Sequence, residues 1–265
     1  MKIIDAHTHI YPEKIAEKAS GGISAFYDMK VKYNGTAAEL LEICERAGVS
    51  ACVICSVATI PAQVPTINDF IANSAAKSNG RFIGLCALHP AMSEAEIAAE
   101  ITRTKAAGLR GIKIHPDFQR FAIDDPAVFK IYEAAVSENL PILFHTGDTR
   151  YSFSNPARLA KILKLFPRLT AIGAHFGGWS EWGDVDCLGG FENFYVDTSS
   201  SLYTLAPNRA NALIELFGKE RVMFGTDYPM WDADGELGLL EGLGLGDEVK
   251  EFVFYRNAER VFGGL

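Results

Sequence analysis

The sequence lacks the features that mark membrane proteins and nucleic-acid binders. No hydrophobic run comes near the roughly 20 residues that span a bilayer, and the start from Met1 to His9 has no signal-peptide apolar region. Positive charge is also scarce, because 25 lysines and arginines stand against 33 aspartates and glutamates, a net charge of −8. Such a chain has no basic surface for nucleic acid or anionic lipid. We therefore expect a soluble protein with a small-molecule partner and no nucleic-acid or membrane partner.

Cysteine is sparse too, and its pattern argues against a disulfide framework. The five cysteines are odd in number, and most lie in apolar segments. Cys52 and Cys55 form a C-x-x-C motif inside a strand-like run, without the turn and helix start that a redox motif uses. We expect buried thiols and a cytoplasmic location, where thiols stay reduced.

No interior linker rich in proline, glycine or serine divides the chain, so we expect one domain over residues 1–265. Short apolar runs alternate with amphipathic segments from end to end, as buried parallel strands alternate with helices. The predicted strands are Lys2–His9, Val49–Val57, Arg81–Leu88, Leu109–His115, Pro141–His145, Leu169–His175, Asn193–Asp197 and Arg221–Asp227.

Helix starts and stops between these strands are marked by capping residues. Thr36 with Glu39, and Ser93 with Glu96, have the spacing of a capping box. The predicted helices are Thr36–Ala47, Ser93–Ala107, Asp125–Glu138, Asn155–Phe166 and Pro207–Phe217. We expect a long loop from His9 to Asn34, and loop with a short helix in the glycine-rich stretch Gly235–Gly246.

Eight strand–helix units at about 30-residue spacing favour a (β/α)8 TIM barrel, an α/β fold that often has about 250 residues. The competing fold, an open doubly wound sheet, usually has a glycine-rich phosphate loop after its first strand. Here that strand ends in Asp5-Ala6-His7-Thr8-His9 instead. The sequence therefore predicts the barrel.

The six histidines all fall at or just beyond the ends of predicted strands; they are His7, His9, His89, His115, His145 and His175. Barrel active sites lie at that end of the strands. Because side chains alternate along a strand, His7 and His9 should share a face and could bind one metal ion. Asp5 should lie on the same face, one step deeper.

Further candidate ligands follow three later strands. His145 and His175 end the fifth and sixth predicted strands, and Asp227 follows the eighth. Three of these four histidines together with the carboxylate of Asp227 would suit a borderline divalent ion. Zinc is the first expectation, and Mn2+, Fe2+ or Ni2+ are the alternatives.

These motifs resemble the amidohydrolase superfamily in combination. They are H-T-H at His7–His9, F-H-T-G at Phe144–Gly147, A-H-F-G-G at Ala174–Gly178, F-G-T-D-Y-P at Phe224–Pro229 and the closing N-A-E-R-V-F-G at Asn257–Gly263. The chain is most similar to the branch that includes aminocarboxymuconate-semialdehyde decarboxylase and the resorcylate decarboxylases. The resemblance implies that His7, His9, His145 and Asp227 bind the metal. It implies for His175 a role as catalytic base or polarising group, or as ligand of a second ion.

Lys113 and His115 share a face of the fourth predicted strand. In binuclear members of the superfamily, a strand-four lysine becomes carboxylated and bridges two metals, so the resemblance makes Lys113 a candidate for that group. An amine that stays uncarboxylated would be repelled by the metal. His115 would then face the substrate.

The function expected from this site is metal-dependent hydrolysis of a small organic substrate through a metal-bound water, with Asp227 as proton acceptor. The alternative is metal-dependent non-oxidative decarboxylation of a small carboxylic acid. Some decarboxylases of the branch have glutamate in place of the first histidine of H-x-H, and His7 therefore favours the hydrolase. Arg150, with Tyr11 and other loop aromatics, suggests an aromatic or carboxylic acid substrate, and barrels of this kind often form homodimers.

Overall fold

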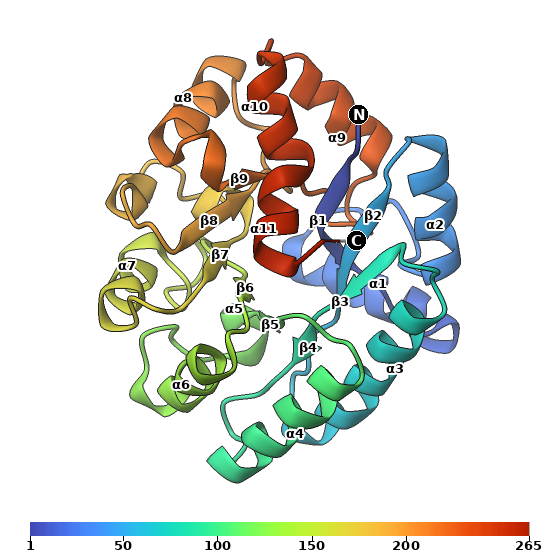
Figure 1. Cartoon of the computed structure of the whole chain (residues 1–265), viewed down its shortest axis with the longest axis vertical. Helices are drawn as coiled ribbons and strands as arrows, with labels where there is room; N and C mark the ends of the chain where they lie inside the picture. The colour runs from blue at the N-terminus through green and yellow to red at the C-terminus, as the bar shows by residue number, and fades with distance from the viewer. Residues whose placement is uncertain (265) are drawn as a thin grey trace.

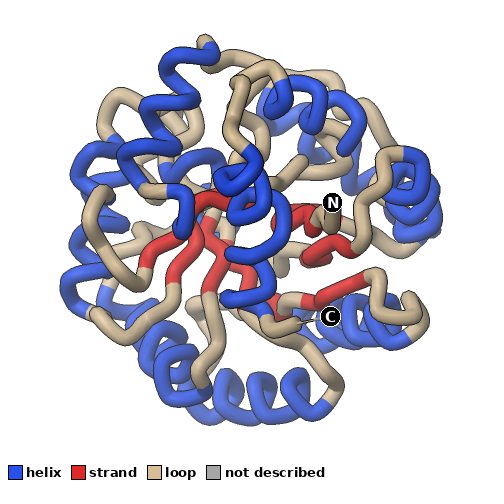
Figure 2. Tube along the Cα trace, turned by 45° about the horizontal axis from the view of Figure 1, so that its top comes forward, coloured by secondary structure: helices blue, strands red, loops and turns tan. Residues whose placement is uncertain are grey.

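A ring of short parallel strands surrounded by helices forms the centre of the molecule (Figures 1 and 2), in a computed structural model that describes residues 1–264. The strands are β1 (Ile4–His9), β2 (Ala51–Cys55), β3 (Phe82–Gly84), β4 (Cys86–Ala87), β5 (Ile112–Ile114), β6 (Ile142–Phe144), β7 (Ala171–Gly173), β8 (Phe194–Asp197) and β9 (Val222–Met223). Neighbours in sequence pair in parallel within two sheets, β1-β2-β3 and β4 through β9.

Backbone hydrogen bonds join these two sheets into the predicted barrel. Strands β3 and β4 are one barrel strand interrupted at Leu85, whose N–H donates to Ile54 O at 2.9 Å. On the other side, Ala6 N donates to Phe224 O at 2.8 Å, and His9 N donates to Tyr228 O at 2.7 Å. The ring therefore closes between its first and last strands, as the sequence predicts.

All five predicted helices are present within a few residues. They are α2 (Ala37–Arg46), α4 (Glu94–Ala106), α6 (Phe129–Glu138), α7 (Pro156–Leu165) and α8 (Pro207–Phe217). Ser93 and Glu96 form the full capping box. At α2 only half of it forms, because the Glu39 carboxylate accepts from the N–H groups of Asn34 and Gly35 instead of that of Thr36.

The long loop predicted from His9 to Asn34 is wrong, because this segment contains the helix α1 (Glu13–Tyr27). Gly21 and Gly22 lie inside α1 and carry weak helix propensity, which hides the helix in the sequence. The glycine-rich stretch contains most of α9 (Ala233–Glu241). The other helices are α3 (Val64–Ala76), α5 (Pro116–Gln119), α10 (Asp247–Glu251) and α11 (Asn257–Phe262), and none of these four was predicted.

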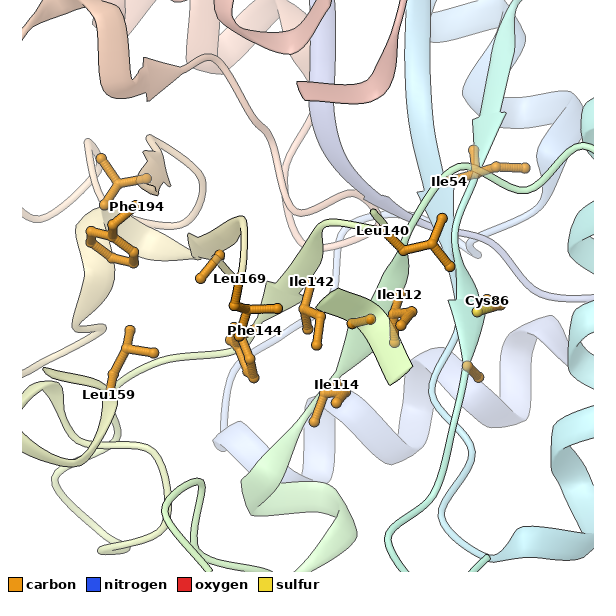
Figure 3. Close-up of a cluster of buried hydrophobic side chains, with 14 of the residues drawn as sticks. Ile54, Cys86, Ile112, Ile114, Leu140, Ile142, Phe144, Leu159, Leu169 and Phe194 are labelled. Carbon is orange, nitrogen blue, oxygen red and sulfur yellow. The ribbon is translucent and has the colours of Figure 1, made fainter. Parts of the chain in front are cut away.

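Two apolar clusters support the ring. The larger one lies between strands and helices and includes Ile112, Ile142 and Phe144, whose side chains lie near one another in Figure 3. The smaller one collects strand residues of the opposite parity, such as Val53 and Leu143, together with Ala258 and Phe262 of α11. Helix α11 thus packs against the barrel interior, and the histidine-bearing strand ends remain open for a site. No helix within the described residues has the length and apolar character needed to cross a membrane.

Candidate active site

His7, His9 and Asp227 converge where the first and last barrel strands meet. A β-bulge between Asp5 and Thr8 shifts the register, so that Asp5 pairs with Cys52 whereas His9 pairs with Cys55. Cys55 belongs to the interior cluster and Cys52 to the outer one. The bulge thus breaks the alternation, and the prediction that Asp5 shares the face of the histidines is wrong. Asp5 accepts instead from the backbone N–H groups of His7 and Thr226.

The three donor atoms have the spacing of a metal site. His7 Nε2 lies 3.1 Å from His9 Nε2, and Asp227 Oδ1 lies 3.5 Å from the first nitrogen and 3.3 Å from the second. Metal–nitrogen bonds near 2.0–2.1 Å in a tetrahedral arrangement place two ligand atoms about 3.4 Å apart. The side chains therefore fit a single divalent ion with little movement.

The electrostatics of this cluster also favour a cation. Burial, together with the charge of Lys113, lowers the pKa of His7 to about 4. Burial opposes the protonation of His9, but Cys55 and Asp227 outweigh it and raise the pKa of His9 to about 9. Burial disfavours ionised Asp227 as well, yet His7, His9 and His175 together hold the pKa of this carboxyl below its usual range. An ionised carboxylate among imidazoles attracts a positive charge, which a proton or a metal ion can supply.

Asp197 and Ser199, at the end of β8, hold the ring of His7 from behind. Asp197 Oδ2 and Ser199 Oγ each lie 3.0 Å from His7 Nδ1. Since a carboxylate only accepts, it keeps the proton on Nδ1 and leaves the Nε2 lone pair of His7 for a ligand. Gly225 permits this packing, because a Cβ there would lie 3.2 Å from Cβ of His7. Sequence reasoning assigned no role to Asp197, although its place at a predicted strand end was a usable signal.

A chain of hydrogen bonds also defines the free nitrogen of His145. His175 Nδ1 lies 2.9 Å from the carbonyl oxygen of Ser199, so it carries a proton and its Nε2 is an acceptor. His145 Nδ1 lies 3.1 Å from that Nε2 and is therefore the donor. His145 Nε2 is left as a buried lone pair without a hydrogen-bond partner among the described residues. An orphaned buried nitrogen of this kind suits a metal ligand.

A second group of possible ligands, formed by His115, Asp117 and His145, fits a metal poorly. All three are buried, and Asp117 Oδ2 lies 3.7 Å from His145 Nε2. The rings of His115 and His145, however, stack with centroids 3.9 Å apart and only 7° between their planes. Imidazole lone pairs lie in the ring plane, and those of parallel stacked rings cannot converge on one ion. We therefore assign no metal ion to this group; His115 and His145 line the cavity, and Asp117 does not.

The remaining predicted site residues are divided between the cluster and its surroundings. Lys113 reaches the cluster, with Nζ 2.9 Å from His7 Nε2. Tyr11 and His115 line the cavity beside it. Arg150 is not among the cavity-lining residues of the described chain, because its guanidinium forms a two-pronged pair with the buried carboxylate of Asp148 at 2.9 and 2.6 Å.

The cavity next to the donors has a volume of about 330 Å3. His9, His115, His145 and Asp227 form its polar side. Its apolar side comes largely from α1, the helix that sequence analysis missed, and from Phe118 and Met230; the α1 residues are Ala19, Gly22, Ile23, Phe26 and Tyr27. No lysine or arginine is among the residues that line it within the described chain.

Two of the site residues have left-handed backbone conformations. His175 has a φ of 60° and Asp227 a φ of 62°. Such conformations are uncommon for residues other than glycine and collect at functional sites. The backbone at the ends of β7 and β9 is thus shaped to aim these two side chains at the cluster.

A family model described as amidohydrolase matches residues 4–264, and the chain therefore belongs to the amidohydrolase family. Among solved structures, an uncharacterised TIM-barrel protein from Bordetella bronchiseptica is 19% identical, with a TM-score of 0.82 and 98% of each chain covered. A dihydroxybenzoic acid decarboxylase from Polaromonas sp. JS666, with bound manganese and the inhibitor 2-nitroresorcinol, is 16% identical; its TM-score is 0.75, with 98% of this chain and 96% of that chain covered. A probable 2-pyrone-4,6-dicarboxylic acid hydrolase from Acinetobacter baumannii with citric acid bound is also 16% identical, with a TM-score of 0.73 and both chains fully covered at 100%. These similarities confirm the TIM-barrel fold and the predicted family.

Proposed function

We propose that this chain is a metal-dependent hydrolase that acts on a small organic substrate in the cavity beside β1 and β9. One observation carries the proposal: three donor atoms, from His7, His9 and Asp227, lie within 3.5 Å of one another. Two of these residues also line the cavity. A substrate in the cavity would therefore be next to the metal.

We assign one divalent ion to His7, His9, His145 and Asp227. The spacing of the His7, His9 and Asp227 donors and the charge of Asp227 support three of these ligands, and the family resemblance and the partnerless Nε2 among the described residues support His145. Zinc is the first choice for such a nitrogen and oxygen set, and manganese, iron or nickel accept the same ligands. When bound, the ion supplies a Lewis acid that polarises a carbonyl group and makes water a nucleophile at neutral pH.

Two residues move protons in this proposal. Asp227 stays ionised, and its Oδ2 accepts from Ser200 Oγ at 2.8 Å, so this carboxylate is placed to take the proton of the attacking water. Ser199 O fixes the Nδ1 proton of His175, so Nε2 is the proton-accepting atom of this ring; it serves the leaving group when the hydrogen bond that it accepts from His145 Nδ1 at 3.1 Å opens. The apolar face of α1 excludes water from the other side of the substrate.

The first experiment measures metal content and hydrolysis of a panel of carboxylic esters and lactones. His9→Gln should lose the ion and at least 99% of activity, an effect on the order of 100-fold or more. His89→Gln is the matched control, since His89 also follows a strand but does not line the cavity. A pure wild-type protein without a divalent ion, and without rescue by added zinc or manganese, would refute the proposal.

A second candidate is non-oxidative decarboxylation, which the apolar cavity wall favours. Loss of carbon dioxide disperses the charge of a carboxylate, and a dry wall without lysine or arginine assists such a step. Release of carbon dioxide from aromatic monocarboxylic acids, with no ester or lactone hydrolysis, would select this candidate. Both reactions use the same metal site, so the two assays belong on the same metal-loaded preparation.

A further inference from the structure

We propose that Tyr27 determines substrate specificity by donating a hydrogen bond to a neutral oxygen of the substrate, such as an ether or carbonyl oxygen. The inference rests on the proposed function, because it places the substrate in the cavity beside the metal ligands. Its basis is a hydrogen-bond chain that runs from the backbone of Phe118 through His115 to Tyr27.

The direction of this chain follows from its first donor. The backbone N–H of Phe118 lies 3.3 Å from Nδ1 of His115, and a backbone N–H can only donate. Nδ1 therefore carries the lone pair of the neutral imidazole, and the ring proton lies on Nε2. His115 Nε2 is 3.0 Å from the hydroxyl oxygen of Tyr27, so this oxygen accepts the hydrogen bond. The hydroxyl proton of Tyr27 is left free.

The cavity that Tyr27 lines can supply a partner for this free proton. Within residues 1–264, the Tyr27 hydroxyl has no hydrogen-bond partner besides His115. Tyr27 and His115 both line the cavity, and the nearby lining side chains include the apolar Ile23 and Phe118. A hydroxyl donor in apolar surroundings gains most from a partner supplied by the ligand. A substrate oxygen at this position would satisfy it.

The partner should be uncharged. The cavity lining contains no lysine or arginine within the described chain, so a second anionic group far from the metal would have no counter-charge. A single neutral donor is suited to an ether, carbonyl or hydroxyl oxygen. The substrate class is therefore a small compound with one metal-binding group and a neutral oxygen at a distance from it.

The Tyr27 ring is held firmly enough to select for such an oxygen. The guanidinium of Arg150 lies 5.1 Å from the centre of the Tyr27 ring and 4.9 Å from that of Phe26, and Asp148 fixes the guanidinium. Phe26 meets Phe118 edge to face, with ring centres 4.5 Å apart. A donor fixed by its neighbours costs a ligand little ordering free energy.

Benzohydroxamate and its ring-substituted forms test the proposal on the zinc-loaded protein. The hydroxamate group chelates the metal, and the ring carries either a methoxy group, which has an acceptor oxygen, or an ethyl group of similar size, at the ortho, meta or para position. We expect one methoxy isomer to bind about five- to tenfold more tightly than its ethyl counterpart, which is the value of one hydrogen bond. Tyr27→Phe should abolish this preference, so that each methoxy isomer binds no more tightly than its ethyl counterpart.

Tyr151→Phe is the matched control, because Tyr151 stacks on Phe26 but is 40% exposed and does not line the cavity. It should keep the methoxy preference. If the parent binds but no methoxy isomer is preferred, or if the preference survives in Tyr27→Phe, the proposal for Tyr27 is overturned. If the parent itself does not bind the metal-loaded protein, the proposed metal site fails instead.

A measurement that needs no metal decides the proton positions separately. Nitrogen-15 NMR of histidine-labelled protein distinguishes the two neutral tautomers, and the signals of His115 are those lost in His115→Gln. We expect the proton on Nε2, and a change at that nitrogen in Tyr27→Phe. A proton on Nδ1 would overturn the proposal, since the Tyr27 hydroxyl would then donate to His115 and have no proton for a substrate.

Discussion

The side-chain nitrogen of Lys113 lies 2.9 Å from Nε2 of His7, the same atom that we assign to the metal. Burial lowers the pKa of Lys113, and Nζ donates to the His7 lone pair whether the group is an ammonium or an amine. A metal ion would take that lone pair and displace the amine. Lys113 and the ion thus compete for one atom, unless the lysine is carboxylated and becomes a ligand.

We predict that Lys113 and the metal ion compete for Nε2 of His7, and that each chain binds one ion. Lys113→Met removes the competing donor and should tighten metal binding by up to about tenfold, the value of one hydrogen bond. Metal titration with a chromophoric chelator measures both stoichiometry and affinity. Two ions in the wild type, falling to one or none in Lys113→Met, would instead show a carboxylated lysine that bridges two metals.

Asp197 should control metal affinity through the tautomer of His7. Asp197→Asn can turn its NH2 group toward His7 Nδ1, which would move the ring proton to Nε2 and block the ligand position. We expect metal affinity to fall about 10- to 100-fold, as for other partners of metal-binding histidines. Ser199→Ala keeps the carboxylate and should have a smaller effect, and Asp186→Asn, on the exposed surface, is the control. Unchanged affinity in Asp197→Asn would contradict the role of this carboxylate.

Sequence reasoning found the cluster because its ligands lie at strand ends, where alternation and barrel geometry place them together. It placed Asp5 on the wrong face because a bulge changes the alternation without changing the residues. The segment of α1 was predicted as a loop because Gly21 and Gly22 weaken its helical pattern. The cavity wall that carries Tyr27 was therefore not predicted.

Contacts between distant segments account for the other gaps. Asp197 and His7 are 190 positions apart in the sequence. Only the closed barrel shows that the Asp197 carboxylate orients the His7 imidazole. Arg150 suggested a carboxylate-binding group, but its partner is Asp148, two residues away, and its guanidinium lies over the rings of α1. A sequence shows that an arginine is present, but not which acidic or aromatic side chains its guanidinium will contact in the folded protein.

Arg150 should hold α1 against the cavity. Arg150→Lys keeps the charge but loses the planar group that pairs with Asp148 and stacks on Phe26 and Tyr27. We expect amide hydrogen exchange in α1 to become about tenfold faster, corresponding to about 1.4 kcal/mol less protection. Arg168→Lys, at an exposed position, should leave α1 exchange unchanged. Equal exchange in Arg150→Lys and wild type would show that α1 is held by its apolar contacts alone.

Glu236 should make the protein less stable as pH rises. This carboxyl, on α9, is buried, and its Oε2 has no hydrogen-bond partner within the described residues. Burial raises its pKa to about 8 from the ordinary value of 4.5. The folded state therefore binds more protons than the unfolded state between these two values, and its contribution to stability is lost as pH rises through this window.

Glu236→Gln removes the charge but keeps the size of the side chain. We expect little gain in the free energy of unfolding near pH 4 and a growing gain up to pH 8, bounded by about 5 kcal/mol from the two pKa values. Urea unfolding at a series of pH values measures this difference, with Glu215→Gln as the control on the exposed side of α8. A gain that is the same at every pH would show that Glu236 does not titrate in the folded protein.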